Sequence, residues 1–227
     1  FRFGVRNVIT LPFVPSNFQE VNPHRDSLIE KVKWGLAGPE ALADYKRLGW
    51  RVRLLGAQSV PELMEVDEHL RANTPTHSLY TLFWSISPYK RSNWQELLTA
   101  VHCSRAQTWA EAIYALYGEE IPPATLYLAF GKPMISTDII PPLLFDELQC
   151  YWSQQPGYTL TERQLRTILY DYAYLRNTWQ EEKLERAKEV LIHQEAWEQE
   201  LILGLGRRLG PFWYPSPMSS LAWTDDR

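Results

Sequence analysis

Residues 161–205 read TERQLRTILYDYAYLRNTWQEEKLERAKEVLIHQEAWEQELILGL and form the longest helical pattern in this chain of 227 residues. Neither proline nor glycine occurs in them before Gly204, and a capping-box pair, Thr161 and Gln164, stands at the start. The apolar side chains that follow recur at steps of three and four: Leu165, Ile168, Tyr172, Leu175 and Trp179. Such steps place apolar side chains on one helix face. We therefore expect one long C-terminal helix, unless it breaks near Gln180–Glu189, where the apolar stripe thins.

Helical spacing also dominates residues 26–120. It predicts helices over 26–36, 39–48, 59–70 and 93–117. Three shorter stretches leave the element open: Val5–Thr10 could be a short strand, Arg51–Leu55 a strand or a loop, and Leu79–Ile86 a strand or a buried helix. Because helix outweighs every other pattern, the sequence favours a mainly α fold, an irregular helical protein with one long C-terminal helix.

Proline marks the remaining segments, since it removes a backbone donor and disfavours helix at the preceding residue. Residues 1–25 carry prolines among apolar side chains and are expected to form an extended N-terminal arm. Residues 121–160 are expected to form a proline-rich connector with a short apolar helix at Leu143–Trp152. Residues 206–227 are expected to form a second extended arm without regular structure.

Aromatic side chains are abundant in both arms. The chain has 10 Trp, 12 Tyr and 8 Phe, and the following stand in the arms: Phe1, Phe3, Phe13, Phe18, Phe212, Trp213, Tyr214 and Trp223. Buried aromatic residues dominate interface energetics, and each covers ~150–250 Å². An arm of this composition would expose an apolar patch if it stayed in water. We therefore expect these side chains to bind other protein subunits.

Charge and composition limit the other partners. The formal net charge is -4, and the content of 45% hydrophobic residues is ordinary for a globular protein. A local excess of Lys and Arg over residues 31–53 leaves contact with nucleic acid as an alternative, because clustered cations neutralise phosphates. The sequence has no apolar run of about 18 residues, so we expect no membrane span. The start at Phe1, with two arginines before the first acid, suggests the end of a mitochondrial targeting segment.

Motifs of well-known catalytic chemistry do not occur in the sequence. The chain lacks G-x-S-x-G, the Walker loop and G-x-G-x-x-G, and its two cysteines are too few for a disulfide framework. Glu65 with His69, and Glu189 with His193, share helix faces, but the Glu-x-x-His spacing of a di-metal bundle is absent. We therefore predict no catalytic, cofactor-binding or metal-binding residue and no cofactor.

Short stretches are similar to bacterial class I terpene cyclases. Leu11–Phe13 with Asn22–His24 resembles the opening of those enzymes. The spacing of their second metal motif, with Glu where Ser or Thr is usual, recurs at Asn177, Glu181 and Glu185. The aspartate-rich motif that this family also needs on an earlier helix has no match, and the nearest stretch is Val66–Glu68. The resemblance implies a helical enzyme that binds a diphosphate through metal.

These features together favour a non-enzymatic structural or accessory subunit of a large assembly. A mitochondrial respiratory complex, ATP synthase or mitochondrial ribosome would suit the arms, and so would a virion. One alternative is a helical enzyme or binder with an apolar cavity, similar to a terpene cyclase. The other is a subunit that contacts RNA through residues 31–53.

Overall fold

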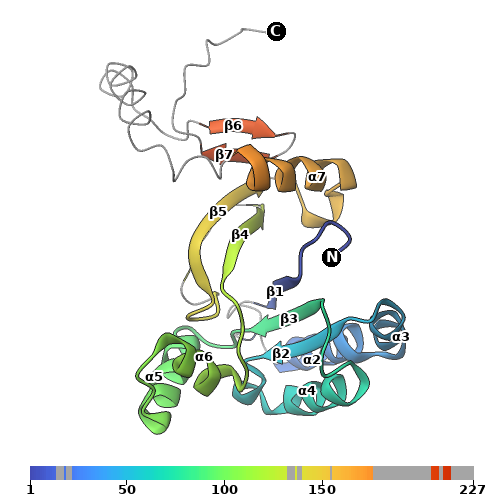
Figure 1. The fold of residues 1–227 in the computed structure, drawn as a ribbon. Coiled ribbons are helices and arrows are strands. Elements are labelled where there is room, and N and C mark those ends of the chain that lie inside the picture. Colours follow the sequence, from blue (N-terminus) through green and yellow to red (C-terminus); the bar gives the residue numbers. More distant parts are fainter. Residues whose placement is uncertain are drawn as a thin grey trace, which may run out of the picture. The chain divides into compact units, whose positions relative to one another are not determined.

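The computed structural model describes residues 1–13, 18, 22–131, 136, 140–153, 155–175, 206–209 and 212–215 (Figure 1). The chain divides into two compact units. The first comprises Phe1–Ala124 and Ile135–Asp146, and the second comprises Thr125–Met134 and Glu147–Arg227. Each unit has a sheet and an apolar core of its own.

A three-stranded parallel sheet forms the centre of the first unit. Its strands are β1 (Asn7–Phe13), β2 (Arg51–Leu55) and β3 (Thr81–Ile86), in the order β1-β3-β2. The register aligns Val8, Leu82 and Val52 across the sheet and, one position on, Ile9 with Phe83. Because successive side chains point to opposite faces, the two rows belong to two different helix layers.

The face of the sheet that carries Val52 and Leu82 is covered by the first helix layer. Its helices are α2 (Asn22–Ala37), α3 (Pro39–Leu48) and α4 (Pro61–Asn73). Buried apolar side chains at helical spacing on α2 and α4 belong to this core: Ile29, Val32, Leu36, Leu63, Val66 and Leu70. Pro39 and Pro61 stand in the first turns of α3 and α4, where the helix needs no donor from them.

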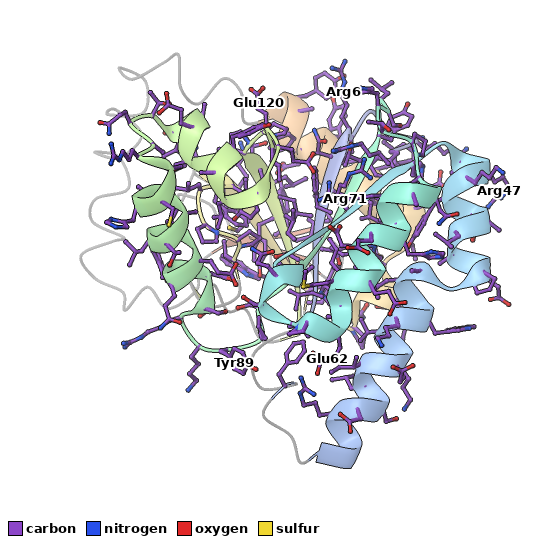
Figure 2. All side chains as sticks on the ribbon, turned by 90° about the horizontal axis from the view of Figure 1, so that it is seen from below. Arg6, Arg47, Glu62, Arg71, Tyr89 and Glu120 are labelled. Atoms are coloured by element: carbon purple, nitrogen blue, oxygen red, sulfur yellow. The ribbon has the colours of Figure 1, made fainter. Side chains whose placement is uncertain are left out.

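The face that carries Phe83 packs against the second layer, α5 (Ser92–Ser104) and α6 (Trp109–Tyr117). Figure 2 shows the two helix layers on opposite sides of the strands. The core on this side consists of Leu55, Phe83, Ile113, Ile121 and Leu144. The single helix expected over 93–117 is two helices, because Arg105 takes a left-handed φ of 57° and a capping box at Thr108 starts α6.

The second unit contains a four-stranded sheet and a short helix. Its strands are β4 (Ala124–Phe130), β5 (Phe145–Ser153), β6 (Gly206–Leu209) and β7 (Phe212–Pro215), in the order β4-β5-β7-β6. β7 runs antiparallel to both β5 and β6. α7 (Glu162–Tyr170) begins at the capping box that the sequence predicted and continues into a π-helical turn, η3 (Asp171–Leu175). The buried side chains of Tyr151 and Ile168 form its core.

The expectation of a mainly α protein is wrong, because the first unit is an α/β fold with a parallel sheet. Strand β3 is a short apolar stretch buried on both faces, which shows no alternation, and β2, with Arg51 and Arg53, alternates too briefly to identify a strand. The stretch Leu143–Trp152, expected to be a helix, lies mostly in β5, where aromatic residues fit a pleated surface. The three stretches left open by the sequence coincide with β1, β2 and β3.

The long helix and the extended arms also differ from expectation. α7 ends at Tyr170, and residues 176–205 of the expected helix lie outside the described part of the chain. The N-terminal arm contains β1, and the C-terminal arm contains the β6–β7 pair. Pro215 is compatible with β7 because it stands at the strand's end, where a ladder donor is dispensable. Among the helices that the structure describes, none has the length and apolar character needed to cross a membrane.

Candidate functional site

The chain leaves β1 and β3, two neighbouring strands, toward opposite faces of the sheet. After β1 it forms α2 and α3 on one face, and after β3 it forms α5 and α6 on the other (Figure 2). In open parallel sheets, ligands bind in the crevice beyond the carboxyl ends of such strands. The carboxyl ends of β1 and β3 are therefore the candidate functional site of the first unit.

Buried polar side chains lie directly beyond β3. Ser87, Ser92 and Asn93 are only 1%, 5% and 7% exposed, and we name them the β3 polar cluster. Ser92 Oγ donates to the Tyr89 carbonyl oxygen at 2.8 Å and lies 3.4 Å from Ser87 Oγ. Asn93 Nδ2 donates to the Ile140 carbonyl oxygen at 3.2 Å. These bonds fix the loop that leads from β3 into α5.

The N-terminus of α5 opens at the same edge. Its N-cap residue, Arg91, has a left-handed φ of 64°. Such a backbone is uncommon for a residue with a side chain, and it recurs where structure is held in place for a function. The first amide groups of a helix lack internal acceptors and, together with the helix dipole, attract anions. The junction of β3 and α5 can therefore hold an anionic group.

The turn that follows β2 is tied to α5 by a carboxylate. Glu96 on α5 accepts hydrogen bonds from Gln58 Nε2, at 3.1 Å, and from Ser59 Oγ. Burial raises the pKa of Glu96, and these two hydrogen bonds act in the opposite direction. Gly56 enters the turn with a φ of 81°, and a Cβ at this position would overlap the Ile86 carbonyl oxygen. The turn after β2 is thereby held against both α5 and the end of β3.

A cation borders the site on α2. Arg25 pairs with Glu62 of α4 at 2.9 Å and with Asp26 at 3.5 Å. The hydrogen bond to Glu62 raises the pKa of Arg25, so the guanidinium stays charged. Figure 2 shows Glu62 and Tyr89 at one end of the sheet and Arg6 at the other. The Arg25 pair therefore lies at the end of the sheet that holds the candidate site.

An ion-pair network occupies the edge strand β2. Arg51 forms an ion pair with Glu119, and Arg53 Nε lies 3.9 Å from Glu119 Oε1. Arg53 is 4% exposed and also donates to Thr74 Oγ1 at 3.1 Å. Desolvation lowers the pKa of Arg53. Two basic residues of the 31–53 stretch, proposed as a nucleic-acid contact, are thus used inside the fold.

The aromatic residues predicted to bind partners occupy several places. Phe1 contacts Trp50 and Tyr80 with ring-centroid distances of 4.8 and 5.3 Å, and Phe18 is 7% exposed in the core of the first unit. Phe13 is the last residue of β1. The others are the partly buried Phe3, then Phe212, Trp213 and Tyr214 of β7, and Trp223, which lies outside the described residues.

The residues considered as metal ligands or nucleophiles are scattered. Glu65 and His69 are both exposed on α4, whereas Glu189, His193 and the terpene-cyclase-like motif at Asn177, Glu181 and Glu185 lie outside the described residues. Within the described part of the chain, no group of three His, Cys, Asp or Glu side chains could hold a metal ion. The thiols of Cys103 and Cys150 are free.

Sequence reasoning missed the β3 polar cluster. Ser87, Ser92 and Asn93 belong to no catalytic motif, and Asn93 was interpreted only as the start of a helix. The available signal was positional: an apolar run ends at Ile86, a short polar loop follows, and a helix then begins. That pattern is typical of a strand–loop–helix unit, whose loop is where an α/β fold places its ligand.

Comparison with known sequences identifies two relatives, although no protein-family model matches the chain. The (+)-kolavelool synthase of Herpetosiphon aurantiacus is 43% identical over 220 residues, which are 96% of this chain and 76% of that protein. The tuberculosinyl adenosine transferase of Mycobacterium tuberculosis is 39% identical over 70 residues, which are 31% of this chain and 23% of that protein.

Two crystal structures share the fold. A probable undecaprenyl diphosphate synthase from Campylobacter jejuni superposes with a TM-score of 0.61 at 16% identity, over 75% of this chain and 82% of its own. Lavandulyl diphosphate synthase from Lavandula x intermedia, in complex with dimethylallyl diphosphate, superposes with a TM-score of 0.52 at 13% identity, over 75% and 77%. Both matches support the α/β fold.

These comparisons correct the functional expectation. The prediction of a non-enzymatic structural subunit is wrong, because the sequence relatives are a synthase and a transferase. The alternative of an enzyme agrees with the relatives, which are enzymes. The helical fold expected for that enzyme is wrong, because the first unit contains a parallel sheet. With 43% identity over 96% of its length, the chain belongs to the family of (+)-kolavelool synthase.

Proposed function

We propose that this chain is an enzyme of terpenoid metabolism that binds a prenyl diphosphate at the carboxyl ends of β1 and β3. The family relationship supports a terpenoid product, since the relative that covers most of the chain is a (+)-kolavelool synthase. The substrate class is supported by the fold, which is shared with two prenyl diphosphate synthases. One of these crystal structures contains dimethylallyl diphosphate.

The observation that carries the proposal is the β3 polar cluster at the switch point of the sheet. Ser87, Ser92 and Asn93 are buried polar groups at the N-terminus of α5, where backbone amides and the helix dipole favour an anion. Lys90 and Arg91 lie in the loop that leads into the helix. A diphosphate has the charge and the acceptor oxygens that such a site recognises.

The chemistry that this site would support is ionisation of the substrate. The bond between the prenyl carbon and the diphosphate oxygen breaks, and its electron pair leaves on the diphosphate, so a carbocation remains on the prenyl chain. Negative charge then grows on the leaving oxygen, and donors fixed in advance around it lower the barrier. The role assigned to α5 and its loop is to bind and stabilise this leaving group.

Product analysis with the purified full chain tests the proposal. Geranyl, farnesyl and geranylgeranyl diphosphate are offered separately, released diphosphate is quantified, and extracted products are identified by gas chromatography and mass spectrometry. We expect release of diphosphate together with an organic-soluble terpenoid from at least one substrate. The proposal is contradicted if no prenyl diphosphate is turned over and none is bound in calorimetry.

Two sequence predictions concern other properties of the chain and stay untested. The aromatic end segments are proposed to contact other proteins, and a co-purification experiment with Trp213→Ala and Trp223→Ala variants would test this. A mitochondrial location is likewise a proposal, which import into isolated mitochondria would test. Neither prediction is needed for the enzymatic proposal.

A further inference from the structure

A hydrogen-bonded link joins α5 to the turn that follows β2, η1 (Ala57–Ser59). Glu96 lies one helical turn after Ser92, so its side chain leaves α5 on the face that also carries part of the β3 polar cluster. Glu96 Oε2 accepts a hydrogen bond from Gln58 Nε2 at 3.1 Å, and Glu96 Oε1 accepts one from Ser59 Oγ. Both carboxylate oxygens are therefore engaged by the turn, and we name this contact the Glu96 link.

The turn is a fixed base for the Glu96 link. Its backbone is closed by a hydrogen bond from the Ser59 amide to the Gly56 carbonyl oxygen at 3.2 Å, and Val60, which follows, is only 2% exposed. Gly56 lies so close to β3 that an added Cβ would overlap the Ile86 carbonyl oxygen. Ile86 is the last residue of β3 and directly precedes Ser87 of the β3 polar cluster. The turn therefore has little room to move relative to the end of β3.

α5 is fastened at a second point, near its N-terminus. Asn93 Nδ2 donates to the Ile140 carbonyl oxygen at 3.2 Å. Two residues further along the chain, the Pro142 carbonyl oxygen accepts a hydrogen bond from the hydroxyl of Tyr117 on α6 at 2.7 Å. The first turn of α5 is thus held through Asn93, and the second turn is held through Glu96. Fastening at two successive turns fixes both the rotation and the axial position of the helix.

The charge of Glu96 works against an anion at the N-terminus of α5. Like charges repel, and the leaving group would bind near the turn of the helix that precedes Glu96. Burial also disfavours the charged form and raises the pKa of Glu96. The two donors of the turn offset these costs, and they leave neither carboxylate oxygen turned toward a ligand. The contribution of this side chain therefore lies in holding α5.

We propose that Glu96 is a positioning residue for the diphosphate: through the Glu96 link it fixes the first amides of α5 where charge develops on the leaving group. This role rests on the proposed function, because it assigns Glu96 a part in that reaction. Donors stabilise a transition state when they are in place beforehand. A displacement of roughly 1 Å can lower the rate about a hundredfold.

Calorimetry with inorganic diphosphate and steady-state kinetics with the best prenyl diphosphate test this role in the full chain. Glu96→Ala removes the Glu96 link. Glu96→Gln keeps it, because the amide oxygen can accept from Gln58 and the amide nitrogen can donate to Ser59 Oγ. Thr108→Ala is the matched control, since it removes the capping box of α6 and lowers stability in the same helix layer. Thermal unfolding gives the Tm of each variant, and the calorimetric stoichiometry gives the fraction of folded sites.

Glu96→Ala should bind inorganic diphosphate more weakly. Its kcat and kcat/KM should fall by roughly tenfold to a hundredfold, with a smaller change in KM. Glu96→Gln should behave like the parent chain, and Thr108→Ala should lower Tm without changing diphosphate affinity or kcat/KM. If Glu96→Ala does not fold, Ser59→Ala, which removes one donor of the Glu96 link, should show a smaller loss of the same kind.

Three results would overturn the positioning role. Glu96→Ala could bind diphosphate and turn over substrate like the parent chain, Glu96→Gln could lose as much as Glu96→Ala, or Thr108→Ala could lose as much at an equal Tm. A parent chain that binds neither inorganic diphosphate nor a prenyl diphosphate contradicts the proposed function, and the positioning role with it.

Discussion

The carboxylate of Glu96 on α5 accepts a hydrogen bond at 3.1 Å from Gln58 Nε2 in the turn that follows β2. Ser59 Oγ donates to the same carboxylate. The two elements are far apart in sequence but meet at the carboxyl ends of the parallel strands. The position of α5, whose N-terminus we assign to the leaving group, therefore depends on a side chain in the middle of that helix.

Replacement of Glu96 by Gln should remove part of the pH dependence of stability. Burial raises the pKa of Glu96 in the folded protein above its ordinary value of 4.5, so the folded state holds a proton that the unfolded state releases. The free energy of unfolding therefore falls as pH rises from about 4.5 through the folded pKa. Glu96→Gln should lack this fall, and urea unfolding at several pH values measures it.

The control for this prediction is Glu65→Gln on the exposed side of α4. Like Glu96→Gln, this variant removes one negative charge, but it leaves intact the hydrogen bonds between Glu96 and the turn that follows β2. An equal decline in stability with pH for the parent chain and Glu96→Gln would show that burial of this carboxylate has no energetic consequence.

Gly56→Ala should be far more harmful than Gly49→Ala. Both glycines have a left-handed backbone, with φ of 81° and 66°, so alanine is strained by ~1 kcal/mol at either position. Only at Gly56 would the new Cβ also overlap the Ile86 carbonyl oxygen, which adds about 2 kcal/mol or more. Thermal unfolding of the two variants separates the common strain from the steric cost. Similar losses of Tm would mean that the turn after β2 can move away from β3.

Asn93→Asp should impair the enzyme in a way that identifies a site for an anion. The side chain is 7% exposed at the first turn of α5, and a carboxylate there would repel the diphosphate. We expect an increase in KM or a fall in kcat/KM of roughly tenfold to a hundredfold, which corresponds to about 1.4–2.8 kcal/mol. Steady-state kinetics with the best prenyl diphosphate provides the measurement.

Asn73→Asp at the C-terminal end of α4 introduces the same charge away from the carboxyl ends of the strands. It should leave KM unchanged, although it can lower stability because a negative charge at a helix C-terminus is unfavourable. If both variants changed kcat/KM equally, net charge rather than the β3 polar cluster would be responsible.

Sequence patterns identify helices here better than strands. The spacing of Leu63, Val66 and Leu70 was sufficient for α4, and the Thr161 capping box located the start of α7. β2 was ambiguous because Arg51–Leu55 alternates only briefly, and β3 because Leu79–Ile86 is an apolar stretch that fits a strand or a buried helix. A parallel sheet covered on both faces removes that alternation, and its partners are distant in sequence. The local pattern therefore favoured helix throughout, and the parallel sheet at the centre of the first unit was missed.

The candidate site was out of reach for a related reason. Ser87, Ser92 and Asn93 are ordinary residues whose meaning depends on where the chain leaves β1 and β3. The direction of these two exits is a property of topology, which no short motif in this chain encodes. The aromatic residues were easier to notice, but Phe1 and Phe18 belong to the core that supports the sheet.

Tyr151→Phe should destabilise the second unit through loss of one buried hydrogen bond. Tyr151 is fully buried on β5, and its hydroxyl donates to Asp171 Oδ2, itself 2% exposed, at 2.6 Å. Removing the hydroxyl takes away a donor to a buried carboxylate, at a cost of about 1–3 kcal/mol. Tyr158→Phe, at a side chain that is 90% exposed, should cost nearly nothing. Hydrogen exchange should show faster opening of β5 and α7 in Tyr151→Phe, with β1, β2 and β3 unaffected if the two units open separately. Unchanged exchange in β5 and α7 would show that Asp171 is held by its other contacts.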